Sequence, residues 1–117
     1  LNGLGMMLNS MEIYENGKIA CSVLNNQFLE SEPGKQMDTE GFVNYPLSIS
    51  GVDASFLLHE STPNRFRVSL RSKSKIDVNV VANVFGGGGH TLAAGCRIEG
   101  TFSEVKERLL EEIRKQY

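Results

Sequence analysis

Alternating apolar and polar residues predict several short strands along this chain. The clearest alternation lies at residues 65–73, where Phe66, Val68 and Leu70 point to one side and polar residues point to the other. Apolar segments predict further strands at residues 11–14, 18–24, 52–59 and 94–99.

Two turn signals separate these strands. Asn16-Gly17 predicts a tight hairpin turn between the first two strands, because both residue types tolerate positive φ. Residues 60–64 contain Pro63-Asn64 and are expected to form a loop.

Apolar residues at helical spacing predict two helices in the second half of the chain. The first begins after its expected N-cap, Asp77, and ends at Gly86. Its buried face consists of Val78, Val81, Ala82 and Phe85. The second begins with the capping-box residues Thr101 and Glu104. Its apolar face consists of Phe102, Val105, Leu109, Ile113 and Tyr117.

The first half is expected to contain less regular helices at residues 1–9, 25–32 and 38–45. Asp38 or Thr39 would cap the last of these, and Pro46 would limit it. Strands mixed with helices predict an α/β (α+β) fold with a mixed central sheet of about five strands and helices packed on it. No repeat or long linker divides the chain, so residues 1–117 are expected to form a single domain.

The composition is that of an ordinary globular domain, with 40% hydrophobic and 22% charged residues among 117. No segment resembles a membrane span or a signal peptide, so we expect a cytoplasmic protein without a membrane partner. The formal net charge of −2 argues against a protein that coats nucleic acid with its whole surface. Because the chain begins at Leu1 and not at Met, we expect a fragment of a longer protein.

The two cysteines, Cys21 and Cys96, belong to no CxxC or Cys/His array. We therefore predict no metal site in this chain and interpret both residues as buried apolar thiols, in preference to a disulfide.

The strongest candidate for a binding site is a run of four glycines, Gly86 to Gly89, followed by His90. Glycine lets backbone approach a ligand closely, and successive amides can converge into an anion nest, while His90 adds a hydrogen-bond donor. The alternative is a flexible linker, or a turn in which His90 is structural. Apolar residues on both sides of the run argue against a mobile linker. The run follows a helix, so it is neither a Walker loop nor a dinucleotide-binding loop.

A second candidate is the polar side of the segment at residues 65–73. Every second residue from 67 to 73 is polar, namely Arg67, Ser69, Arg71 and Lys73. Ser72 adds a further polar residue at the end of the strand. Guanidinium groups bind phosphate through paired donors, although a solvated strand face gives the same pattern. The end of this strand and the glycine run lie at opposite ends of the intervening helix, so the sequence leaves open whether they converge.

Other polar and aromatic residues carry less weight. His59 is interpreted as structural or exposed, and Tyr14 as a packing residue. Tyr45 could either pack or stack on a base.

Several segments of the sequence resemble a known family. Val84-Phe85-Gly86-Gly87-Gly88-Gly89-His90 and the following Ala93-Ala94-Gly95 are similar to the signature of the C-terminal DHH-associated domain of DHH phosphoesterases. Ser69-Leu70-Arg71-Ser72 resembles the other polar strand of that domain. Residues 38–46 and 95–100 are similar to the branch of bacterial oligoribonucleases, or nanoRNases, which also dephosphorylate 3′-phosphoadenosine 5′-phosphate.

This resemblance implies a two-lobed hydrolase in which this chain is the substrate-binding lobe for short RNA or a nucleotide bisphosphate. The other lobe carries an Asp-His-His triplet and binds two manganese ions that activate water. The ligand-binding residues carried over are Gly86, Gly87, Gly88, Gly89, His90, Arg71 and Ser69, with weaker transfers to Ser72, Lys73 and Asn44. This chain lacks the triplet, so we expect no catalytic residue, metal or cofactor in it, and no activity on its own.

Several alternatives remain open at this stage. The chain could be an RNA-binding module like the C-terminal domains of alanyl-tRNA synthetases, or a lobe of a cyclic-di-AMP phosphodiesterase. A structural domain or a homodimer is also compatible with the sequence.

Overall fold

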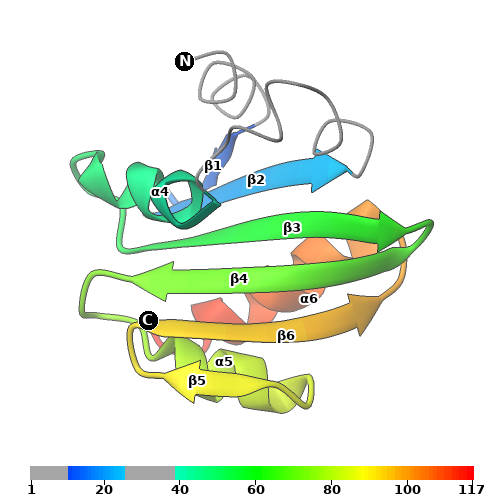
Figure 1. Cartoon of the computed structure of the whole chain (residues 1–117). Coiled ribbons are helices and arrows are strands. Elements are labelled where there is room, and N and C mark those ends of the chain that lie inside the picture. The colour runs from blue at the N-terminus through cyan, green and yellow to red at the C-terminus, as the bar shows by residue number, and fades with distance from the viewer. Residues whose placement is uncertain (1–10, 26–38) are drawn as a thin grey trace.

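The computed structural model describes residues 11–25 and 39–117, and within them a mixed sheet of six strands forms the centre of the fold (Figure 1). The strands are β1 (Glu12–Tyr14), β2 (Ile19–Asn25), β3 (Ala54–Thr62), β4 (Arg65–Ser72), β5 (Gly88–His90) and β6 (Ala93–Glu99). Their order is β1-β2-β3-β4-β6-β5, and only β2 and β3 pair in parallel. The α/β (α+β) class is confirmed, with one strand more than expected because part of the glycine run pairs as β5.

Helices cover the two faces of the sheet unequally. The helical elements are α4 (Thr39–Asn44), the 3-10 helix η1 (Tyr45–Ser48), α5 (Val78–Val84) and α6 (Phe102–Arg114). In Figure 1, α5 and α6 lie behind the sheet, while α4 lies in front and packs against β3 and β4. The front of β6 and β5 is thus left without a covering helix among the described elements.

The core lies between the sheet and the helices α5 and α6. It is built from the alternate residues of each strand, such as Phe66, Val68 and Leu70 of β4, and from Val81 and Leu109 of the two helices. The alternation that predicted β4 is therefore confirmed: its even-numbered residues are buried, and its odd-numbered residues are exposed or half-buried. Burial of one face holds the sheet in a single register, because a slip of one residue would expose the apolar set.

Two connections differ from the expected turns. Between β1 and β2 the connection has four residues, 15–18, and Glu15, Asn16 and Gly17 all have positive φ. The predicted loop at residues 60–64 is wrong for its first part, because β3 continues to Thr62 through a bulge. The hairpin turn itself is confined to Pro63 and Asn64, where Asn64 adopts a φ of 62°.

The predicted N-caps of α5 and α6 are confirmed. Asp77 accepts hydrogen bonds from the backbone amides of Asn79 and Val80 at the start of α5, and Thr101 and Glu104 form the capping box of α6. These bonds satisfy amides that have no partner within the first helical turn.

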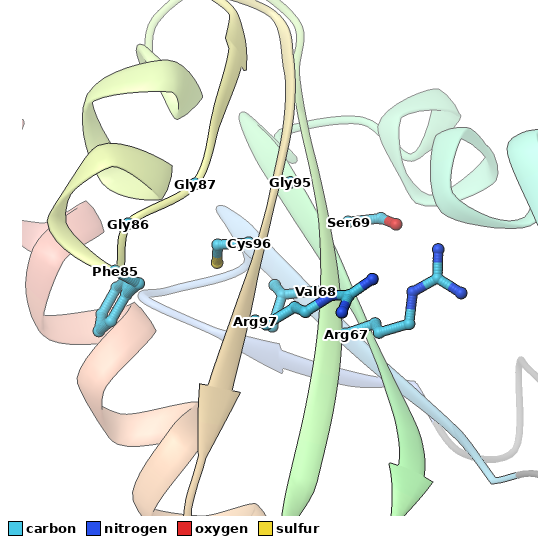
Figure 2. Close-up of a pocket in the computed structure, with 9 residues that line it drawn as sticks. All are labelled: Arg67, Val68, Ser69, Phe85, Gly86, Gly87, Gly95, Cys96 and Arg97. Carbon is cyan, nitrogen blue, oxygen red and sulfur yellow. The ribbon is translucent and has the colours of Figure 1, made fainter.

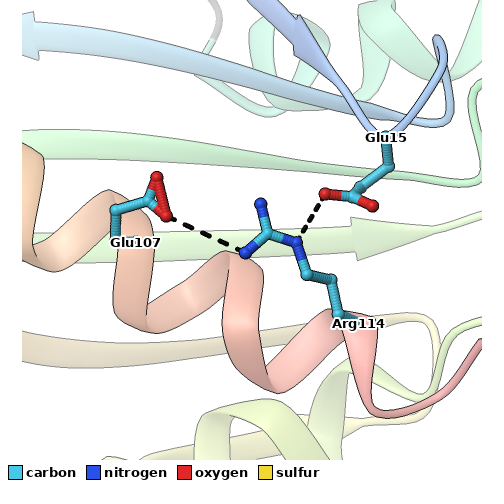
Figure 3. Close-up of polar contacts among 3 residues, drawn as sticks. All are labelled: Glu15, Glu107 and Arg114. Carbon is cyan, nitrogen blue, oxygen red and sulfur yellow. Dashed lines mark hydrogen bonds and ion pairs between the residues drawn. The ribbon is translucent and has the colours of Figure 1, made fainter.

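The end of the chain is anchored to the sheet. The guanidinium of Arg114 lies between Glu15 and Glu107 and so joins α6 to the turn after β1 (Figure 3). Tyr117 lies beyond the end of α6, not on its apolar face as expected, and its hydroxyl donates to Asp53 (2.8 Å).

Some expectations lie outside the described residues. They are the helix predicted at residues 1–9, most of the helix predicted at residues 25–32, and the predicted Asp38 cap of α4. The first residue of that second helix, Asn25, is instead the last residue of β2. Within the described ranges, no helix is both long and apolar enough to cross a membrane.

Candidate functional site

Three of the predicted binding residues, Ser69, Arg71 and His90, lie on the sheet face that points away from α5 and α6, which we call the open face. Its first row of side chains crosses four strands, because Arg71 of β4 pairs with Ser55 on one side and Ala93 on the other, and Ala93 pairs with His90 of β5. Residues opposite one another in antiparallel strands project to the same face. Arg71 and His90 are therefore roughly 10 Å apart across the sheet, with only the methyl group of Ala93 between them.

The path of the glycine run brings about this convergence, which the sequence left open. The run leaves the end of α5 and returns as β5, antiparallel to β6, so that His90 arrives beside the end of β4. Two backbone hydrogen bonds secure the return, from Val78 N–H to the Thr91 carbonyl (2.9 Å) and from Ser72 N–H to the Leu92 carbonyl (3.0 Å).

The expectation of an anion nest in the run is wrong for three of its four amides. The Gly86 amide donates to the Asn83 carbonyl (3.1 Å) and the Gly87 amide to the Ala82 carbonyl (2.9 Å), which is the Schellman closure of α5. The Gly89 amide donates to the Asn79 side chain (2.9 Å). These amides complete the fold and do not converge on a common centre.

Two of the glycines are required by close packing. A Cβ on Gly87 would lie 2.1 Å from the carbonyl oxygen of Gly95, and one on Gly89 would lie 2.6 Å from that of Ala93. Gly86 instead has a φ of 82°, as the residue after a helix often does. Close packing against β6 and the end of α5 together account for three of the four glycines without a ligand.

Polar groups of β4 lie beside this packed strand. Arg71 is half-buried and its Nη1 donates to the Leu70 carbonyl (2.9 Å), which holds the guanidinium near the strand. Ser69 is half-buried opposite Gly95, which has no side chain to cover it. His90 is exposed at the edge of the sheet. The first row thus offers a guanidinium and an imidazole, and the next row adds the hydroxyl of Ser69 on the same face.

A further row of cations lies along the same strands. Arg67 pairs directly with Arg97 of β6, and His59 of β3 pairs with Arg67 from the other side. In Figure 2 the side chains of Arg67, Arg97 and Ser69 lie on one side of the sheet, whereas Cys96 and Phe85 lie on the other. A hollow of about 450 Å³ connects the glycine loop, at Gly86 and Gly87, with Ser69 and the two arginines.

Arg97 was not identified from the sequence. The signal was present, because Cys96 and Ile98 are buried on either side of it and β6 alternates as β4 does. Only the β4–β6 pairing shows that Arg97 faces the same way as Arg67. The same row places His59 at the margin of the open face, where burial and the charge of Arg67 lower its pKa.

The weaker candidates lie outside the first row. Ser72 is buried, and its hydroxyl accepts a hydrogen bond from the Ile76 amide (3.3 Å), so the alternation of β4 turns it away from the open face. Lys73 follows the end of β4 and donates to the Ile49 carbonyl (3.1 Å). Asn44 is exposed at the end of α4, and Tyr45 is exposed at the start of η1.

The cysteines are buried free thiols, as expected. Burial raises the pKa of Cys21 to about 12 and that of Cys96 to about 11, so neither is a nucleophile. Among the described residues, no three His, Cys, Asp or Glu side chains are grouped as metal ligands.

The fold and its glycine-histidine strand can be compared with known proteins. Residues 16–117 match the family of DHHA1 domains. The chain belongs to this family. It is 34% identical over 109 residues to a probable bifunctional oligoribonuclease and PAP phosphatase, NrnA, of Streptococcus mutans, covering 88% of the DHHA1 chain and 34% of that protein. It is 30% identical over 109 residues to the cyclic-di-AMP phosphodiesterase PdeA of Listeria monocytogenes, covering 92% of the chain and 16% of that protein.

A solved structure shows the same arrangement. An exopolyphosphatase-related protein from Bacteroides fragilis is similar to 97% of the DHHA1 chain with a TM-score of 0.80 and 35% identity, over 34% of its own chain. The chain thus spans about a third or less of the length of the curated relatives and of the solved structure that it matches.

Proposed function

We propose that this DHHA1 domain is the substrate-binding lobe of a phosphoesterase that hydrolyses short oligoribonucleotides and 3′-phosphoadenosine 5′-phosphate. The observation that carries the proposal is the row Arg71–Ala93–His90, which sets a guanidinium and an imidazole on one open face across a single small residue. Arg71 would bind a phosphate through charge-assisted hydrogen bonds, with Ser69 and His90 as further donors. The names of the relatives, two of which are an oligoribonuclease with PAP phosphatase activity and a phosphodiesterase, agree with this chemistry.

Hydrolysis itself would belong to the other lobe of the enzyme. The described residues group no ligands for a metal pair and show no activated nucleophile. When two manganese ions are bound in the other lobe, they would supply the activated water. The DHHA1 domain would hold the substrate phosphate and orient the scissile bond, and alone it would be inactive. A cytoplasmic location remains a prediction.

Calorimetry with 3′-phosphoadenosine 5′-phosphate tests the binding role. We expect His90→Ala to weaken binding, and Arg71→Ala to reduce the binding free energy by about 1–3 kcal/mol, as loss of a charge-assisted hydrogen bond does. Lys115→Gln at the end of α6 is the matched control, because it removes one exposed charge whose partner, Glu112, lies on the same helix. Unchanged affinity in the His90 and Arg71 variants, with the fold intact, would refute the assignment.

The same chain can test the neighbouring possibilities. Phosphate release from the bisphosphate by this chain alone with manganese would contradict its predicted inactivity. Preferred binding of a cyclic dinucleotide over a linear one would favour the lobe of a cyclic-di-AMP phosphodiesterase, which the similarity to PdeA supports. Tight binding of whole tRNA would favour an RNA-binding module.

A further inference from the structure

The row formed by Arg67 and Arg97 brings two positive charges together without a carboxylate partner among the described residues. The two arginines are directly opposite in the β4–β6 ladder, and no carboxylate of the described residues forms an ion pair with either. Like charges in this position destabilise a sheet. The next row shows the contrast, because there Arg65 forms an ion pair with Glu99 (3.8 Å). The excess positive charge at this end of β4 and β6 is therefore confined to Arg67 and Arg97.

Two hollows of the surface meet at this arginine pair. One, of about 450 Å³, extends from the pair past Ser69 and Gly95 to the glycine loop (Figure 2). The other, of about 530 Å³, extends from the same pair to Ser61 and Thr62. The pair thus lies where the two hollows meet, and the first hollow also contains Ser69, which we assign to the proposed phosphate site.

Spacing separates the two cationic rows. Arg67 and Arg71 are four residues apart on β4, which corresponds to roughly 13 Å along an extended strand. Between them the row of Ser69 and Gly95 carries only a small side chain and none. One phosphate group does not fill both rows, whereas a linear chain of phosphodiesters carries a charge at each linkage along such a path.

We infer that Arg67 and Arg97 form a second anion subsite that binds a later phosphate of a linear oligonucleotide whose first phosphate is held by Arg71 and His90. The inference rests on the proposed function and adds a preference for length. Ligands with several linkages reach the second subsite, and a single nucleotide bisphosphate does not. Binding of a phosphate between the two guanidinium groups removes their mutual repulsion.

Calorimetry on the 117-residue chain with two ligands tests the second subsite. The ligands are 5′-phosphorylated tetraadenylate and 3′-phosphoadenosine 5′-phosphate. The variants are Arg67→Gln and Arg97→Gln, with Lys115→Gln at the end of α6 as the charge-matched control. We expect each subsite variant to lose about tenfold in affinity for the tetranucleotide, and none for the bisphosphate. The slope of log affinity against log salt should become shallower by about 0.7 per lost contact for the tetranucleotide alone.

Stability gives an independent readout. If the arginine pair stabilised the fold, both glutamine variants would unfold at lower urea concentration. If the two arginines only repel each other, removal of one charge leaves the unfolding midpoint unchanged or raises it. If a glutamine variant does not fold, Arg97→Lys keeps the charge and much of the stem. It should retain the salt slope while losing part of the affinity, because lysine lacks the bidentate fork.

The outcomes separate the two proposals. Equal losses for both ligands, or no loss for either, would overturn the second subsite while the effects of His90→Ala and Arg71→Ala still support the first. If the unsubstituted chain binds neither ligand, the proposed function fails.

Discussion

Gly87→Ala should destabilise the domain far more than Gly88→Ala. The added Cβ would lie 2.1 Å from the Gly95 carbonyl oxygen and 2.6 Å from the Cys96 Cβ. An ordinary carbon–oxygen contact is about 3.3 Å, so backbone must move by about 1.2 Å. Gly95 is held between β4 and β5 and cannot yield without loss of pairing. We expect a loss of about 3 kcal/mol, at the upper end for overpacking, which is roughly 12 °C in Tm for a chain of this size.

Two neighbouring glycines provide matched controls. A Cβ on Gly88 would lie 3.6 Å from the side-chain oxygen of Asn79, an ordinary contact, and 3.3 Å from that of Asn83, a side chain that needs to shift only slightly. Gly88→Ala should therefore change stability by less than about 0.5 kcal/mol. Gly86→Ala meets nothing within 4 Å but forces alanine to a φ of 82°, which costs about 1–2 kcal/mol. Urea unfolding of the three variants measures the order. Equal midpoints for Gly87→Ala and Gly88→Ala would refute the steric argument.

Two further predictions concern titratable groups. Burial and Arg67 lower the pKa of His59, so the unfolded chain takes up a proton more readily, and stability should fall as pH drops below about 6.5. His59→Gln should make the unfolding free energy, measured in urea, depend less on pH. The same pH dependence in the variant and the unsubstituted chain would contradict this role of His59. Cys21 and Cys96, with pKa values of about 12 and 11, should react with a thiol reagent only on unfolding, and rapid reaction of the native chain would contradict their burial.

Elements with a strong local pattern were predictable from the sequence. The alternation of Phe66, Val68 and Leu70 and the caps at Asp77 and Thr101 predict β4, α5 and α6 because a single burial period and local hydrogen bonds determine them. The site was predictable only in part. The sequence identifies Arg71, Ser69 and His90 as candidate binding residues. That they lie on the same face follows only from the pairing of β4, β6 and β5, which no local signal specifies.

The strand β5 shows why the rest was not predictable. Gly88 and Gly89 have no side chains, so the segment has neither alternation nor β propensity, and it becomes a strand only because β6 offers a free edge. The prediction of an anion nest was wrong because it also considered the segment by itself. Amides that are unpaired in a loop considered alone are bonded to α5 in the fold, at Asn83, Ala82 and Asn79.

These observations change how loss of binding in this run should be interpreted. Three of the four glycines serve the fold, since Gly86 ends a helix and Gly87 and Gly89 pack against β6. Substitutions there move β5, and with it His90, so a binding defect would follow from displacement even if no glycine touched the ligand. Gly88→Ala and His90→Ala are the variants in which structure and binding separate. If Gly88→Ala keeps its unfolding midpoint but loses affinity for 3′-phosphoadenosine 5′-phosphate, the run contacts the ligand directly. If only His90→Ala loses affinity, the glycines act by positioning the imidazole beside Arg71.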